Sequence, residues 1–290
     1  MSKEKINNIV IPLLVLVALV GWLDGRLPLR GGEEKSIEKQ AVASSYTAPE
    51  SVVLPIRWAD IGERLVETGV IDVEKLEQLY AQRGGLSQAE KELLTDVGEK
   101  GLVMRADNSA YLLNLLWAFG LANKSAALEE GPMRGDPQMT GSMASTGGWT
   151  LARGPAMDHY SQHALVELGE EEEALVEEVA KNIFRPCCGN STYFPDCNHG
   201  MAMLGLLQLM AKEGASEEQM YEVALKVNSL WFPGTYQAIA DYFALNGQDW
   251  QSVDPKVILS ANYSSGSGYQ AVVQALEGQE GYSNGGGCGV

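Results

Sequence analysis

Apolar residues recur at helical spacing through most of the chain. In residues 56–80, IRWADIGERLVETGVIDVEKLEQLY, this spacing predicts two helices separated at Gly69, and Asp72 is placed to cap the second one. Ser87 and Glu90 stand three positions apart, which is the pattern of a capping box at the start of another helix. Helices are therefore expected from about residue 56 onward.

The rest of the pattern is also mainly helical. Residues 108–124, NSAYLLNLLWAFGLANK, are apolar almost all round and predict a buried helix, whereas residues 169–186 predict an amphipathic one. Further helical patterns occupy 241–246 and 271–278. Strand alternation is scarce, and residues 100–107, KGLVMRAD, are the one modest candidate, as half of a short hairpin. The fold class expected is mainly α, a helical bundle-like body with long loops.

The same pattern divides the chain into segments. Residues 1–24 predict a membrane anchor or uncleaved signal, and residues 25–54 a polar tether. Residues 55–278 form the expected helical domain, followed by a flexible glycine-rich tail over 279–290. Within the domain, residues 131–155 are dense in Gly, Pro, Ser and Thr, and any sub-boundary is expected there.

The membrane prediction depends on the apolar run from Ile9 to Leu23. The run is shorter than the roughly 20 residues of a full span, and Trp22 and Leu23 stand where a signal-peptide cleavage site would need small residues. We therefore expect one N-terminal membrane helix that is retained. Its short charged head, with Lys3 and Lys5, resembles an export signal, so the body is expected to be membrane-anchored and outside the cytoplasm.

The charge balance narrows the range of partners. The chain has 21 basic and 38 acidic residues, a net charge of -17. A surface this acidic repels phosphate backbones, so we expect no nucleic-acid partner. It is compatible with a basic protein partner or a cation.

The strongest chemical signal is the stretch RPCCGNSTYFPDCNHGMAM, residues 185–203. It holds Cys187, Cys188 and Cys197, three of the four cysteines of the chain, and His199, one of its three histidines. Three thiolates and one imidazole are the ligand set of a tetrahedral zinc site, and thiolates equally suit copper(I) or iron–sulfur chemistry. The spacing is unusual, because adjacent cysteines followed by an eight-residue gap do not match C-x2-C.

A helix is expected to follow these cysteines, with Asp196 as its cap and Cys197 in its first turn. The helix dipole and the neighbouring Arg185 would both favour a thiolate at Cys197 or Cys187. His199 begins the buried face of this helix, so it is interpreted either as a core histidine or as a ligand.

Two further groups could join the site. His159 and His163 are four residues apart in a segment expected to be helical, and they lie on a face away from its apolar residues. Cys288 follows three glycines in the tail, so it could supply a fourth sulfur, form a disulfide, or lie in a disordered end.

Three functional hypotheses remain open from the sequence. The first is a membrane-tethered helical protein that binds a metal through the Cys/His cluster, for metal handling or electron transfer. The second is a thiol–disulfide oxidoreductase with Cys197 as nucleophile, Cys187 or Cys188 as resolving thiol and Cys288 as a shuttle. The third is a structural or interaction protein stabilised by disulfides. No C-x-x-C redox motif, Walker loop or H-E-x-x-H motif is present, so the sequence names no reaction.

Overall fold

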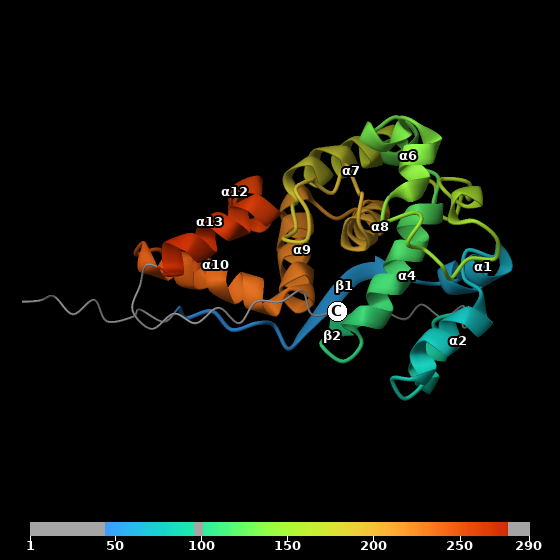
Figure 1. Ribbon diagram of the computed structural model, residues 1–290, viewed down its shortest axis with the longest axis horizontal. Helices are drawn as coiled ribbons and strands as arrows, with labels where there is room; N and C mark the ends of the chain where they lie inside the picture. Colours follow the sequence, from blue (N-terminus) through green and yellow to red (C-terminus); the bar gives the residue numbers. More distant parts are fainter. Residues whose placement is uncertain (1–43, 96–100, 278–290) are drawn as a thin grey trace, which may run out of the picture. The chain divides into compact units, whose positions relative to one another are not determined.

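The computed structural model describes residues 44–95 and 101–277. They fall within one of the two units of the chain, Gln40–Val290. In chain order (Figure 1), the elements are β1 (Ser51–Arg57), α1 (Ile61–Glu67), α2 (Val73–Ala81), α3 (Gln88–Glu92), β2 (Gly101–Arg105), α4 (Ser109–Ala122), α5 (Ala126–Glu129), η1 (Pro132–Arg134), α6 (Pro137–Ser142), η2 (Ala156–Asp158), α7 (Glu170–Asn182), α8 (Asn198–Lys212), α9 (Glu217–Trp231), α10 (Pro233–Leu245), η3 (Trp250–Ser252), α11 (Pro255–Ile258), α12 (Ala261–Ser264) and α13 (Gly266–Glu277). The described part is mainly helical, as predicted, and its strands form one two-stranded sheet.

Helices α4 and α8 pack against each other in the core (Figure 1). Both are buried on nearly all sides, which explains why their sequences show no polar face. They approach closely at Gly120 and Gly205: a Cβ atom on Gly120 would lie 2.2 Å from the carbonyl oxygen of Met201, and one on Gly205 would lie 2.6 Å from that of Leu116. This crossing fixes the position of α8, whose first turn carries the candidate site.

Three helix-end signals in the first part of the folded body are confirmed. Gly69 has φ +79° in the turn between α1 and α2, a conformation that favours glycine. Asp72 caps α2 by accepting hydrogen bonds from the backbone N–H groups of Glu74 and Lys75. Ser87 and Glu90 form the expected capping box at α3. These signals are local, so they could be read from neighbouring residues.

The predicted strand near residues 100–107 is confirmed as β2. The expected short hairpin is not formed, because the partner is β1 and helices α1, α2 and α3 lie between the two strands in the chain. In the antiparallel register Val52 pairs with Met104, and both side chains are buried. Val53 pairs with Val103 on the opposite face, where both are exposed. The sequence did not predict β1 because its consecutive apolar residues and Pro55 hide the alternation.

The fold begins earlier than the predicted body. β1 starts at Ser51, within the stretch assigned to the tether. Upstream of it, the Ser44 hydroxyl donates to the Asp241 carboxylate at 2.7 Å, and Tyr46 packs on Trp250 with ring centroids 4.7 Å apart. Residues 44–54 therefore pack as part of the fold.

The helix expected around His159 and His163 is not formed. Only the short 3-10 turn η2 is present there, and Ser161 has φ +54°, which breaks helical geometry. The backbone N–H groups of Ser161 and His163 instead donate to the carbonyls of Leu121 and Ala122, both at 2.9 Å. Bonds to the end of α4 thus replace the bonds that a local helix would have made.

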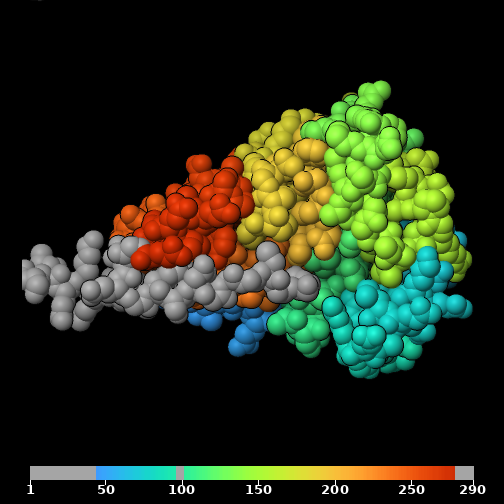
Figure 2. Space-filling model, viewed as in Figure 1, coloured from blue at the N-terminus to red at the C-terminus, as the bar shows by residue number. Residues whose placement is uncertain are grey.

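Residues 131–155 pack against α1 and α2. The indole N–H of Trp149 donates to the carbonyl of Val70 at 2.9 Å, and the N–H of Asp72 donates to the carbonyl of Leu151 at 2.7 Å. Figure 2 shows this green to yellow-green part of the surface against the blue-green part that α1 and α2 form. This segment contains η1 and α6 and is an integral layer of the described structure.

None of the helices in residues 44–95 and 101–277 combines the length and apolarity that a bilayer crossing requires. The predicted membrane helix at residues 1–24 and the tail at 279–290 lie outside the described residues.

Candidate metal centre

The sulfur atoms of Cys187, Cys188 and Cys197 converge. The Sγ atom of Cys197 lies 3.5 Å from that of Cys187 and 3.9 Å from that of Cys188, and all three lie within 4.8 Å of one another. They are free thiols and form no disulfide with each other. Among the described residues, this is the one group of three or more Cys, His, Asp or Glu side chains placed to hold a metal ion.

The cysteine loop is held at three points. The N–H of Cys188 donates to the carbonyl of Arg185 at 3.4 Å, which turns the chain so that both adjacent thiols reach the same place. The carbonyl of Cys188 accepts from the N–H of Gly266 at 2.8 Å, which ties the loop to the start of α13. Cys197 is the N-cap of α8, and its sulfur accepts from the N–H of Gly200 at 3.4 Å.

Asp196 was expected to cap α8, and it does not, because Cys197 occupies the cap position. The carboxylate of Asp196 instead accepts from the Nη2 group of Arg185 at 3.1 Å and from the side-chain amide of Asn190 at 2.8 Å. Asp196 therefore serves as the counter-charge of a buried cation beside the thiols.

That cation is the Arg185 guanidinium, whose side chain is only 1% exposed. Its Nε–H donates to the Sγ atom of Cys197 at 3.0 Å. It fits over the first turn of α8 because position 200 is glycine: a Cβ there would lie 2.3 Å from Nη2 and 2.4 Å from Cζ of Arg185. The sequence indicated Arg185, which stands two residues before Cys187, but it did not indicate Gly200.

The arrangement selects one of the thiols as the thiolate. Hydrogen bonds from Cys187 and Cys188, together with the charge of Arg185, hold the pKa of Cys197 far below its usual range despite burial. The pKa of Cys187 is raised, chiefly by its hydrogen bonds to Cys188 and Cys197. The pKa of Cys188 is raised to about 11: its hydrogen bond with Cys187 lowers it, but its bond to Cys197 and burial outweigh that effect. The predicted thiolate is thus assigned to Cys197.

The sulfur separations match those of ligands on one ion. With zinc–sulfur bonds of about 2.3 Å, two ligands of a tetrahedral site lie about 3.8 Å apart. The observed 3.5 Å and 3.9 Å lie on either side of that value. The site could therefore hold a metal ion with little movement of the chain, even though two of the cysteines are adjacent.

His199 lies near Cys197 but is not a member of the three-sulfur group. Its ring packs against Trp231 and Phe232, with centroids 5.5 Å and 4.5 Å away. Both ring nitrogens are buried without a hydrogen-bond partner. Burial lowers the pKa of His199 to about 4, although the negative charge of Cys197 opposes the shift.

His159 and His163 face each other but do not belong to the three-sulfur group. Burial, followed by the charge of His159, lowers the pKa of His163. Cys288 lies outside the described residues, so its predicted place in the site stays a prediction.

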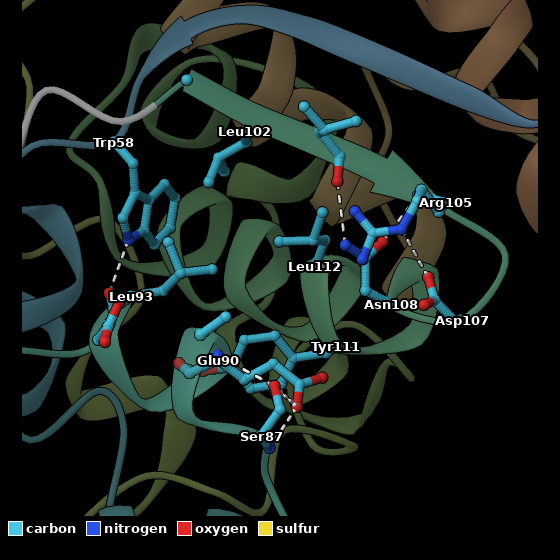
Figure 3. Close-up of a pocket in the computed structure, with 14 residues that line it drawn as sticks. Trp58, Ser87, Glu90, Leu93, Leu102, Arg105, Asp107, Asn108, Tyr111 and Leu112 are labelled. Carbon is cyan, nitrogen blue, oxygen red and sulfur yellow. Dashed lines mark hydrogen bonds and ion pairs between the residues drawn. The ribbon is translucent and has the colours of Figure 1, made fainter.

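One cavity in the described structure is lined by none of these residues. It has a volume of about 500 Å³ and lies between α3, β2 and the start of α4 (Figure 3). Its polar side chains are engaged locally: Arg105 pairs with Asp107 at 3.0 Å, and the Tyr111 hydroxyl donates to the carbonyl of Glu90 at 2.6 Å. We assign no function to it.

Comparison with known proteins gives no match: no protein-family profile, curated protein or solved structure is significantly similar to this chain.

Proposed function

We propose that this protein binds one thiophilic metal ion, Zn²⁺ or Cu⁺, through Cys187, Cys188 and Cys197, and that it holds or transfers that ion. The supporting observation is the separation of the sulfurs, 3.5 Å and 3.9 Å around Cys197, which is the spacing of ligands that share one ion. Thiolates are the ligands that these soft ions prefer.

The geometry favours a single ion over an iron–sulfur cluster. In a four-iron cluster each cysteine binds a different iron, so its ligating sulfurs are separated by the width of the cluster. Here all three sulfurs lie within 4.8 Å of one another. This spacing also favours metal handling over electron transfer through a cluster.

An incomplete ligand set favours transfer over a permanent structural role. Structural zinc sites have four protein ligands, whereas three sulfurs converge here. Cys187 is exposed, so the group is reachable from solvent. The fourth position would be filled by water, by a ligand from a donor or acceptor protein, or by Cys288 from the tail.

The cellular setting remains part of the proposal. The apolar run over residues 9–23 would tether the protein to a membrane, with the metal-binding body outside the cytoplasm. The net charge of -17 would suit a basic protein partner and exclude nucleic acid.

The test is metal analysis together with a thiol count on the same reduced, full-length sample. We expect one equivalent of Zn²⁺ or Cu⁺ per chain and a loss of free thiols on loading. Cys187→Ser, Cys188→Ser and Cys197→Ser should each weaken binding at least about tenfold. His199→Phe, which alters a neighbour outside the sulfur group, should not. A folded protein that binds neither ion would refute the proposal.

A second function, thiol–disulfide exchange, is favoured by the thiolate at Cys197 and its 3.5 Å contact with Cys187. The Cys197 thiolate would attack a substrate disulfide, forming a mixed disulfide and releasing one substrate thiolate. Cys187, once deprotonated, would then attack Cys197, releasing the second substrate thiolate and leaving a Cys187–Cys197 disulfide. A dithiol reductant would restore the thiols.

Alkylation near neutral pH separates this function from simple metal binding. Exchange chemistry predicts fast labelling of Cys197 in the metal-free protein and recovery of a Cys187–Cys197 disulfide after reaction with a model disulfide. Equal, slow labelling of all the cysteines would exclude exchange without affecting the metal proposal.

A further inference from the structure

His159 and His163 form a second group of metal-ligating side chains that the proposed thiolate site does not use. The Nδ1 atom of His159 lies 3.1 Å from the Nε2 atom of His163. Their rings are tilted by 30°, with centroids 5.4 Å apart. The pair was predicted from helical spacing, but tertiary contacts bring the two rings together without a helix.

The hydrogen bond on the far side of His159 fixes its tautomer. Its Nε2 atom lies 3.0 Å from the carbonyl oxygen of Arg153, which can only accept, so Nε2 carries the proton. The Nδ1 atom then presents a lone pair toward His163. An imidazole that donates one N–H to a backbone carbonyl and turns its other nitrogen inward has the arrangement typical of metal-ligating histidines.

The separation of the two nitrogens fits chelation of one ion. With metal–nitrogen bonds of about 2.0–2.1 Å, two ligands lie about 2.9 Å apart at a right angle and about 3.3 Å apart at the tetrahedral angle. The observed 3.1 Å lies between these values. The nitrogens now lie on the line between the two ring centroids, which are 5.4 Å apart, so their lone-pair directions point at each other. To share an ion, both rings would have to turn about their side-chain bonds.

The backbone around the pair is held in place. The N–H of His163 donates to the carbonyl of Ala122 at 2.9 Å, and the carbonyl of His163 accepts from the N–H of Lys124 at the same distance. These bonds attach His163 to the C-terminal end of α4, where the helix dipole favours a cation. The N–H of His159 donates to the carbonyl of Ala156 at 3.0 Å. Binding would therefore require little ordering of the chain.

We propose that His159 Nδ1 and His163 Nε2 chelate a divalent first-row transition-metal ion at a site separate from the thiolate group. Imidazole nitrogens suit Zn²⁺ and Cu²⁺, and water would complete the coordination. The chain would then carry two metal sites of different preference, one of sulfur and one of nitrogen. This site does not depend on the cysteine proposal.

The test is a Zn²⁺ titration of reduced, full-length protein, followed by long-range proton–nitrogen spectra of the imidazoles. The chain has only three histidines, so each ring can be assigned by substitution. After the cysteines are saturated, further Zn²⁺ should shift Nδ1 of His159 and Nε2 of His163 and leave the ring of His199 unchanged. His159→Gln and His163→Gln should each weaken this second event at least about tenfold and leave the first unchanged, whereas Gln162→Ala should change neither.

The wild-type spectrum decides the question without relying on a variant. If Nε2 of His163 stays protonated in a large excess of Zn²⁺, the pair is a hydrogen bond between neutral imidazoles and the proposal is wrong. Loss of the first event alone, with the histidine shifts retained, would refute the cysteine site and support this one.

Discussion

Substitution of Gly200 by alanine is expected to destabilise the protein, although alanine is the better helix former. The helix-propensity gain is at most about 1 kcal/mol at this first-turn position. Against it, the new methyl group would lie 2.3 Å from Nη2, 2.4 Å from Cζ and 2.8 Å from Nε of Arg185. The guanidinium cannot easily move aside, because it is buried and donates hydrogen bonds to Cys197 and Asp196.

Overpacking of this kind costs about 1–3 kcal/mol, and displacement of the guanidinium from its partners would add to that. We therefore expect the free energy of unfolding to fall by about 2 kcal/mol in Gly200→Ala after the propensity gain is subtracted. The assay is urea denaturation of the metal-free, reduced protein.

A double-mutant cycle with Arg185→Met identifies the cause. Methionine is flexible and has no charged group held in place, so the methyl group of alanine should find room beside it. In that background Gly200→Ala should be neutral or stabilising by up to about 1 kcal/mol, giving a coupling energy of about 2–3 kcal/mol between the two positions. An equal effect of Gly200→Ala in both backgrounds would show that the close approach to Arg185 does not decide stability here.

Three further outcomes are expected. The folded-state pKa of His199, about 4, is below its unfolded value of about 6.5, so the unfolded chain binds more protons between these values. The free energy of unfolding of the metal-free protein should therefore fall by up to about 3 kcal/mol as the pH falls through this window. Denaturation of His199→Phe at both ends of the window should show a smaller fall. Ultraviolet titration of the metal-free protein should detect one thiolate at a pH of about 5, lost in Cys197→Ser and kept in Cys188→Ser. Gly120→Ala and Gly205→Ala should each lower the free energy of unfolding by about 3 kcal/mol or more, since backbone carbonyls occupy the space of the new methyl groups; thermal denaturation close to wild type would contradict this.

The sequence by itself determined the helical class and three helix-end signals, although the cap expected at Asp196 was wrong. The caps at Asp72 and Ser87 and the break at Gly69 act over a few residues, and the structure confirms them.

The sequence missed strand β1, because Pro55 and consecutive apolar residues hide the alternation and the partner strand β2 is far away in the chain. The helix expected at His159 and His163 was wrong because backbone bonds to the end of α4 override the local periodicity.

The sequence also determined which loop carries the candidate site, since three of four cysteines lie in residues 187–197. The tertiary structure decided how they are used. The bond from Gly266 to Cys188 and the burial of Arg185 beside Cys197 bring the thiols together, whereas the aromatic packing of His199 leaves it outside the sulfur group. Composition and spacing state which ligand atoms are available, but only long-range packing sets the distances between them, and metal binding depends on those distances.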